Sequence, residues 1–355
     1  MSNFPLRYKL SWLPRLLNPS LGGDRRGFLP AAASLVSPLP AVTKRLLFIG
    51  DISAVSNRTA PLIDEQLKAL IGSADLVIGN CESPVVERVR KRLGTAAGAR
   101  HAMTAAFLSD TLDAAGIARK RLVLSLANNH MLDQGIDGFA ETRATLAAMD
   151  VATIGAMGEG LIRTIDLGGF DVALAAFTAW RNVGRTDFAG RVIMLDDLAR
   201  DDFAALRNAE ADLVCVVAHW DWEFRHIPRP ASRALARRLG GGGAGLIVGG
   251  HAHVLQPAEQ IGATLVAYGL GDFLGTALPH LPWPGRIGAM LAVDVSAEPA
   301  TRGRVAAYEL VPFFRQRAGA RERLSPLADV AGPIGERARG RFAELFPRAV
   351  RAALT

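Results

Sequence analysis

The distribution of apolar residues divides the chain into strand-like runs separated by helical patterns. Short runs of consecutive apolar residues are typical of strands that are buried on both faces. These runs are Arg45–Ile49, Leu76–Ile78, Leu122–Leu126, Leu213–Ala218, Leu246–Val248 and Thr264–Ala267. Apolar positions spaced three or four residues apart predict amphipathic helices between them. We expect these helices at Pro61–Ile71, Thr104–Ala115, Gly135–Met149 and Pro230–Leu239.

The pattern changes after about residue 245. Ala289–Val295 and Arg304–Phe313 follow Thr264–Ala267 as further strand-like runs, without long helices between them. An alternating strand and helix half is therefore followed by a strand-rich half. This order favours an α/β fold with a mixed sheet, or with two facing sheets flanked by helices.

Polar residues follow the predicted strands at the points where the strands end. They form short islands, which are Gly50-Asp51, Asn80-Cys81-Glu82, Asn128-Asn129-His130 with Asp133, His219 with Asp221 and Glu223, His251-Ala252-His253, Gln256, and Tyr268 to Asp272. Ligands and chemistry in open α/β sheets collect at the carboxyl ends of the strands. We therefore predict one polar site along one edge of a sheet.

Composition and charge limit the alternatives. Half of the 355 residues are apolar, which suits one large domain with extensions. The net charge of +7 comes from the ends: residues 1–50 carry seven Lys or Arg against Asp24 alone. The domain that holds the polar islands is therefore not basic, and its aromatic residues do not alternate with a basic stripe. These observations argue against nucleic-acid binding.

Two ends are expected to lie outside a domain of residues 44–318. Residues 1–43 form a basic N-terminal extension with few core-forming residues, and we expect the site to be independent of it. Residues 319–355 form an Arg-rich tail in which apolar residues recur at helical spacing. Cys81 and Cys215 lie in or beside apolar runs, so we expect buried thiols rather than a disulfide.

Membrane contact is expected to be peripheral at most. The sequence contains no run of roughly 18 uncharged apolar residues and no secretory signal pattern. We therefore expect a cytoplasmic protein or one peripheral to the inner membrane. Arg7–Leu17 could lie on an anionic membrane as an amphipathic segment. The alternative is an arm packed on the domain or a disordered leader.

The polar islands have the chemistry of a metal site. His251 and His253, one residue apart after a strand and a Gly-Gly turn, can face one cation if the backbone bends there. Alone they could equally be surface histidines, and His219 could be a histidine at the edge of the core. Together with Asp51 and Glu82 they form a mixture of imidazole and carboxylate that suits Mn²⁺, Fe²⁺ or Zn²⁺.

The ordered motifs GD, NCE, ANNHxxDxG, AHWDWE, GGHAHVLQ and YGLGDF resemble the CapA family of poly-γ-glutamate capsule-synthesis proteins. That family is similar to the calcineurin-like metallophosphoesterases. The resemblance extends from about Arg45 to Phe314. It implies a four-layer α/β/β/α sandwich with two divalent metal ions at the strand ends.

The resemblance also implies a role for each matching residue. The metal ligands would be Asp51, Glu82, Asn129, His219, His251 and His253. The catalytic residues would be His130, which would assist the leaving group, Asp133 and Glu223. Three positions depart from the family pattern: Ser53 replaces a histidine ligand, Asp221 a glycine and Asp272 an asparagine.

Two functions follow from this resemblance. One is a metal-dependent hydrolase of capsule or extracellular polymer metabolism, which would bind an anionic small molecule or polymer and would work with capsule-synthesis proteins. The other is an accessory protein without catalytic activity, which would bind a polyanion or partners of polymer synthesis through a vestigial site. The serine at position 53 and the basic ends favour the second function.

Overall fold

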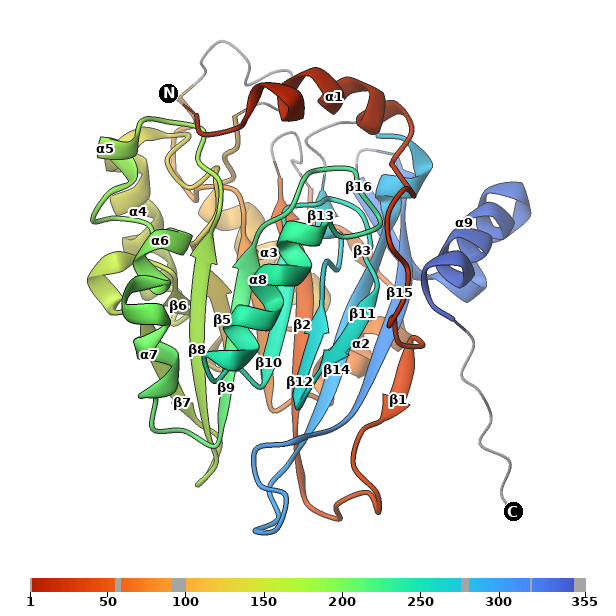
Figure 1. Cartoon of the computed structure of the whole chain (residues 1–355). Helices are drawn as coiled ribbons and strands as arrows, with labels where there is room; N and C mark the ends of the chain where they lie inside the picture. Colours follow the sequence, from red (N-terminus) through yellow and green to blue (C-terminus); the bar gives the residue numbers. More distant parts are fainter. Residues whose placement is uncertain (1, 55–58, 91–99, 276–280, 320, 348–355) are drawn as a thin grey trace.

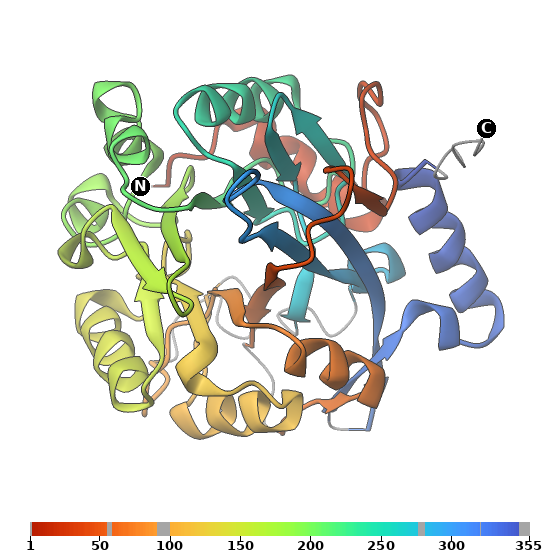
Figure 2. The same cartoon turned by 90° about the horizontal axis from the view of Figure 1, so that it is seen from below.

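In the computed structural model, two β-sheets lie face to face between two layers of helices (Figure 1). The structure describes residues 2–54, 59–90, 100–275, 281–319 and 321–347. Helix α8 lies on the outer face of one sheet, and α2 and α3 lie on the opposite side of the molecule (Figure 2). This arrangement confirms the expected four-layer α/β/β/α sandwich.

The larger sheet contains both parallel and antiparallel strands. Its order along the sheet is β3 (Leu62–Ile63), β16 (Arg321–Pro326), β15 (Val305–Ala318), β14 (Ile287–Ser296), β2 (Thr43–Ser53), β4 (Leu76–Cys81), β5 (Leu122–Ser125) and β6 (Ala152–Ile154). In addition, β1 (Ala32–Ser34) pairs with β15, and β13 (Asp272–Gly275) pairs with β2. Strands β2, β4, β5 and β6 run parallel, so their carboxyl ends share one edge.

The smaller sheet supplies the facing layer. Its order is β11 (Ala258–Ile261), β12 (Thr264–Ala267), β10 (Leu246–Gly250), β9 (Leu213–His219), β8 (Asp171–Thr178) and β7 (Ile162–Asp166). Strands β8, β9, β10 and β12 are parallel. The carboxyl ends of β9 and β10 therefore lie at one edge, where both strands lead into histidines of the predicted site.

Local sequence signals mark the ends of only some of the helices. Their bounds are α1 Leu6–Leu17, α2 Glu65–Gly72, α3 Ala105–Ala115, α4 Gly135–Ala148, α5 Arg185–Phe188, α6 Leu195–Leu198, α7 Ala204–Arg207, α8 Pro230–Gly241 and α9 Gly332–Leu345, with 3₁₀ turns at Arg119–Arg121, Met157–Glu159, Arg200–Asp202, Trp283–Arg286 and Leu327–Asp329. The Thr104 hydroxyl caps α3, and Gly116 ends it in the left-handed conformation. Asp64 caps α2, so the predicted helix Pro61–Ile71 begins four residues later than expected.

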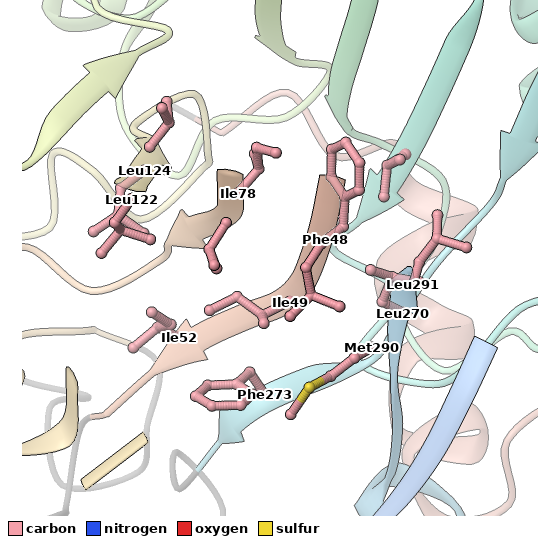
Figure 3. Packing of buried hydrophobic residues seen from close by; sticks show 14 of the residues in the cluster. Phe48, Ile49, Ile52, Ile78, Leu122, Leu124, Leu270, Phe273, Met290 and Leu291 are labelled. Carbon is pink, nitrogen blue, oxygen red and sulfur yellow. The ribbon is translucent and has the colours of Figure 1, made fainter. Parts of the chain in front are cut away.

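The main core lies between the two sheets and extends under α2 and α3. Phe48 and Ile49 of β2 pack near Ile78 of β4, and Phe273 packs near Met290 (Figure 3). A second cluster, which includes Phe177, Trp220 and Tyr268, packs beneath α8. Cys81 and Cys215 are buried free thiols.

Both ends of the chain pack on this framework. Strand β16 forms a hairpin with β15, so a boundary at residue 318 falls inside a sheet. Helix α9 follows it and buries Ala338 and Leu345 in the main core. Residues 348–355 of the predicted tail lie outside the described residues. Strand β1 adds the N-terminal extension to the same sheet as β15.

Candidate metal centre

The predicted ligands converge where the carboxyl ends of the two sheets meet. Asp51 lies on β2, Glu82 directly follows β4, His219 ends β9, and His251 and His253 follow β10. Ligand atoms of Asp51, Glu82, His253 and Asp272 lie within 4.8 Å of one another. Those of Glu82, His251 and His253 form a second such group.

His219 and Asn129 complete this cluster. The Nε2 atom of His219 lies 2.7 Å from Oδ1 of Asn129 and 3.5 Å from Oε1 of Glu82. Nδ1 of His251 lies 3.2 Å from the same Nε2 atom. The structure therefore brings together all six residues that the sequence singled out as ligands.

Local backbone geometry makes this convergence possible. His251 and His253 have φ values of 78° and 52°, which side-chain-bearing residues rarely adopt, and such strained positions cluster at functional sites. Gly250 lies so close to Asp51 that an added Cβ would be 2.6 Å from its Oδ1 atom. The glycine therefore lets the β10 turn approach the carboxylate at the end of β2, and the backbone N–H of His251 donates to Oδ2 of Asp51 at 3.0 Å.

The Glu82 side chain is a fully buried carboxylate, and both its oxygens are without a hydrogen-bond partner among the described residues. The same is true of Nε2 of His251. Buried polar atoms in native proteins nearly always have a partner, and a bound cation would supply one to the Glu82 carboxylate and to His251. The residues around Glu82 provide carboxylate, amide and imidazole donors, a set that fits a divalent transition metal.

Burial and charge set the protonation of the cluster. Burial raises the pKa of Glu82 to about 8 and that of Asp51 to about 6. Burial and repulsion by neighbouring histidines hold the pKa values of His219 and His251 well below the ordinary value. These two imidazoles are therefore neutral, and the neutral form is the one that binds metal.

The pKa of His253 is shifted in the opposite direction. Burial lowers its pKa, but the carboxylates of Glu82 and Asp272 outweigh burial and hold the pKa well above the ordinary value. The carboxylate of Asp272 in turn pairs with buried Arg315 at 3.1 Å. Asp272 was noted in the sequence as a departure from the family pattern and was not among the predicted ligands, yet it lies inside the group.

His130 lies beside the cluster and is held by other residues. Its Nδ1 atom is 2.6 Å from Oδ2 of Asp133, and its ring stacks on His101 with 3.5 Å between ring centroids. Burial lowers the pKa of His130, but the charge of Asp133 raises it above the ordinary value. Asn182 donates to Oδ1 of Asp133 and links it to Asn129. His101 and Asn182 carried no motif in the sequence that could have identified them.

Three other polar positions of the islands are used elsewhere. The Asp221 carboxylate pairs with Arg229 at 2.6 Å and accepts from the backbone N–H of Trp222. The carboxylate that Asp221 brings in place of the family's glycine therefore pairs with Arg229 and the backbone. Gln256 donates to Asp221, and the Tyr268 hydroxyl donates to Glu259.

Ser53 occupies the position of the missing histidine ligand. Its Oγ atom lies 3.1 Å from Nδ1 of His101. The His101 imidazole, which comes from the segment before α3, therefore reaches the end of β2 from a different part of the chain.

The N-terminal segment lies over this edge of the sheets, in contrast to the expectation that the site is independent of residues 1–43 (Figure 1). The Phe4 ring stacks on His251, with 6.0 Å between centroids. The Trp12 indole donates to the Glu223 carboxylate, and Nε of Arg15 donates to the Glu223 backbone oxygen at 2.9 Å. Oε1 of Glu223 lies 4.0 Å from Nε2 of His251.

Comparison with known proteins identifies the family. The model of the bacterial capsule synthesis protein PGA_cap matches residues 45–277, which include every predicted ligand. The chain belongs to the PGA_cap family. Two relatives are a PGA biosynthesis protein CapA of Bacillus subtilis, 29% identical over 245 residues, and a capsule biosynthesis protein CapA of Bacillus anthracis, 30% identical over 213 residues.

The PGA_cap relatives are longer than the matched region. The alignments cover 64% of this chain and 62% of the B. subtilis protein, and 57% of this chain and 51% of the B. anthracis protein. Among solved structures, the chain is similar to the calcineurin-like phosphoesterase YfkN of B. subtilis, with a TM-score of 0.42, 13% identity and coverage of 86% of this chain and 98% of that one. It is also similar to the NAD nucleotidase of Haemophilus influenzae, with a TM-score of 0.43, 13% identity and coverage of 84% and 62%.

Proposed function

We propose that the protein is a metal-dependent hydrolase of the CapA type that acts in the metabolism of a capsule or extracellular polymer. The observation that carries this proposal is the buried carboxylate of Glu82, whose oxygens have no hydrogen-bond partner within the described residues and lie among Asp51, His251 and His253. Such a carboxylate is costly to bury unless it binds a cation.

Two divalent cations, Mn²⁺, Fe²⁺ or Zn²⁺, fit the donors of this cluster. The residues that would hold them are Asp51, Glu82, Asn129, His219, His251 and His253. Bound cations would supply Lewis-acid chemistry and lower the pKa of coordinated water. Asp272 is close enough to add a further carboxylate or to orient His253.

His130 is the candidate proton donor. The Asp133 carboxylate holds its Nδ1 atom and so leaves Nε2 as the nitrogen available to a substrate. A histidine fixed in this way can protonate a leaving group or orient an anion. Glu223 borders the site near His251, where it would position that imidazole or a substrate group.

A polyanionic polymer is the proposed substrate class, in line with the names of the two CapA relatives. Either a phosphoester or an amide of such a polymer presents an anionic oxygen to the cluster. Proteins of polymer synthesis would be the partners. The alternative is an accessory protein without turnover, which Ser53 favours, since this residue stands where the family resemblance places a ligand.

Metal analysis coupled to activity assays tests the proposal. The purified full chain is analysed for transition metals and then offered a phosphomonoester, a phosphodiester and a γ-glutamyl peptide. Two equivalents of metal, with hydrolysis of one substrate that EDTA abolishes, would support the hydrolase. Absence of metal and of hydrolysis after loading with Mn²⁺, Fe²⁺ and Zn²⁺ would instead support the accessory protein.

A further inference from the structure

Helix α1 has an inner face that is fixed to the domain. Tyr8 is buried, and its ring meets that of Trp222 edge-on, with centroids 5.4 Å apart. Trp12 and Arg15 bind the side chain and backbone of Glu223, as described above. These contacts account for the position of the helix without using its other face.

The outer face of α1 is a stripe of exposed leucines. Leu6, Leu10, Leu13 and Leu17 are 71%, 72%, 55% and 67% exposed. Their spacings of four, three and four residues place them on one side of the helix. Large apolar side chains that gather on one exposed face mark an interaction surface, whereas single exposed leucines need no explanation.

Charge indicates what this face contacts. Arg7 and Lys9 are exposed on the same helix, and residues 1–23 contain no Asp or Glu. Pairing with α1 of a second copy would bring these cations together without an acidic residue on either helix to balance them. An anionic surface with an apolar interior would bind the Arg and Lys side chains at its surface and the leucines in its interior.

We propose that the outer face of α1 docks on a lipid bilayer that contains anionic lipids. The leucines enter the boundary between headgroups and acyl chains, and Arg7 and Lys9 remain at headgroup level. Among the helices in the described ranges, none is long and apolar enough to cross a membrane, and this docking requires none.

Docking through α1 also orients the metal centre. The helix lies across the edge where the strands of both sheets end (Figure 1). Its inner face contacts Glu223, and Phe4, just before the helix, stacks on His251. A protein bound through the outer face therefore turns this edge toward the bilayer. This inference does not depend on the proposed hydrolysis.

Co-sedimentation of the full chain with vesicles tests the proposal. One set of vesicles contains phosphatidylcholine alone, and the other contains phosphatidylcholine with phosphatidylglycerol. We expect binding to the anionic vesicles, weakened by salt, and much weaker binding to the neutral ones. The double variant Leu10→Glu/Leu13→Glu should bind anionic vesicles at least about tenfold more weakly, because charged residues replace the inserted side chains.

Two further variants separate the contributions. Ile136→Glu is the matched control, because Ile136 is 47% exposed on α4, and this variant should bind like the wild type. Arg7→Gln/Lys9→Gln should lose much of the preference for anionic vesicles. All substituted residues are exposed, and circular dichroism verifies folding.

Three outcomes would overturn the proposal. The first is equal binding to neutral and anionic vesicles, and the second is binding that survives Leu10→Glu/Leu13→Glu. The third is absence of vesicle binding by the wild type. Light scattering run in parallel would then tell whether the leucine face instead joins two copies of the chain, in which case the double glutamate variant would dissociate them.

Discussion

Nδ1 of His253 lies 2.7 Å from Oδ1 of Asp272, and this contact turns Nε2 of the same ring toward Glu82, whose Oε1 is 3.7 Å away. The Arg315 guanidinium donates a hydrogen bond to the other carboxylate oxygen, Oδ2 of Asp272, at 3.1 Å. A carboxylate on the far nitrogen of an imidazole fixes the ring orientation and raises its strength as a metal ligand. Asp272 thus has a physical role where the family resemblance predicts an asparagine.

Asp272→Asn should therefore lower metal affinity by about 10- to 100-fold, because His253 loses its charged partner. Asparagine is close in size and can still accept a hydrogen bond from Arg315. Titration of the metal-free protein with Zn²⁺ measures the effect. Asp294→Asn is a suitable control, since Asp294 pairs with Arg45 on β2 and is not part of the metal cluster. Equal Zn²⁺ affinity of the two variants would contradict the role given to Asp272.

The two histidines His130 and His253 should differ in their mutational effects. His253→Ala removes a proposed ligand and should lower the metal content of the purified protein. His130→Ala removes the proposed acid and should leave metal content nearly unchanged, while turnover falls by about 10²- to 10⁴-fold. Metal analysis and steady-state kinetics on both variants check this. If His130→Ala strips the metal and His253→Ala does not, the roles are reversed.

Glu82 should make the metal-free protein less stable at alkaline pH. Burial raises its pKa from 4.5 to about 8, so the native state retains a proton that the unfolded state releases. The stability contributed by this proton is complete below the unfolded pKa and is lost as pH rises through the folded value. In EDTA, the Tm should therefore fall as the pH rises from about 4.5 to about 8.

The comparison with Glu82→Gln isolates this effect. The glutamine cannot ionise, so the Tm of the variant should fall less than that of the wild type over the same pH range. The variant also removes the Glu82 charge, which raises the pKa of His253. Thermal unfolding followed by circular dichroism at each pH gives both curves. Parallel curves for the wild type and the variant would show that Glu82 does not hold a proton in the metal-free state.

Local sequence signals predicted the parallel strands and the helices that join them, because a strand buried on both faces needs a continuous apolar run. They did not predict β16, whose sequence RERLSP is charged and which joins the sheet by pairing with β15 and with the short strand β3. They also did not predict β13, four residues long, which places Asp272 beside Asp51. Both strands depend on pairing with distant residues.

The residues of the candidate site also fall into a group that the sequence predicted and a group that it did not. Residues that follow predicted strands, such as His219 and Glu82, could be placed together because parallel strands end at one edge. His101 and Trp12 could not, since each reaches the site from a segment without a strand or a motif. Their positions follow from tertiary packing, which periodicity does not record.

Close backbone contact between β2 and the turn before β13 gives a final prediction. A Cβ added to Gly50 would lie 1.8 Å from the carbonyl oxygen of Gly271, so the strands would have to separate. Gly50→Ala should therefore destabilise the protein by about 1–3 kcal/mol or more, as overpacking of a core does. It should also weaken metal binding, because Asp51 is the next residue and Asp272 follows Gly271.

Gly72→Ala is the matched control for this substitution. Gly72 ends α2, and nothing in the described structure lies within 4 Å of an added Cβ. Alanine there should leave metal affinity unchanged and stabilise the protein by about 0.4–1 kcal/mol, since it restricts the unfolded chain. Urea unfolding and Zn²⁺ titration of both variants check the pair. Unfolding free energies within error of each other would mean that β2 and β13 are not packed as closely as the structure describes.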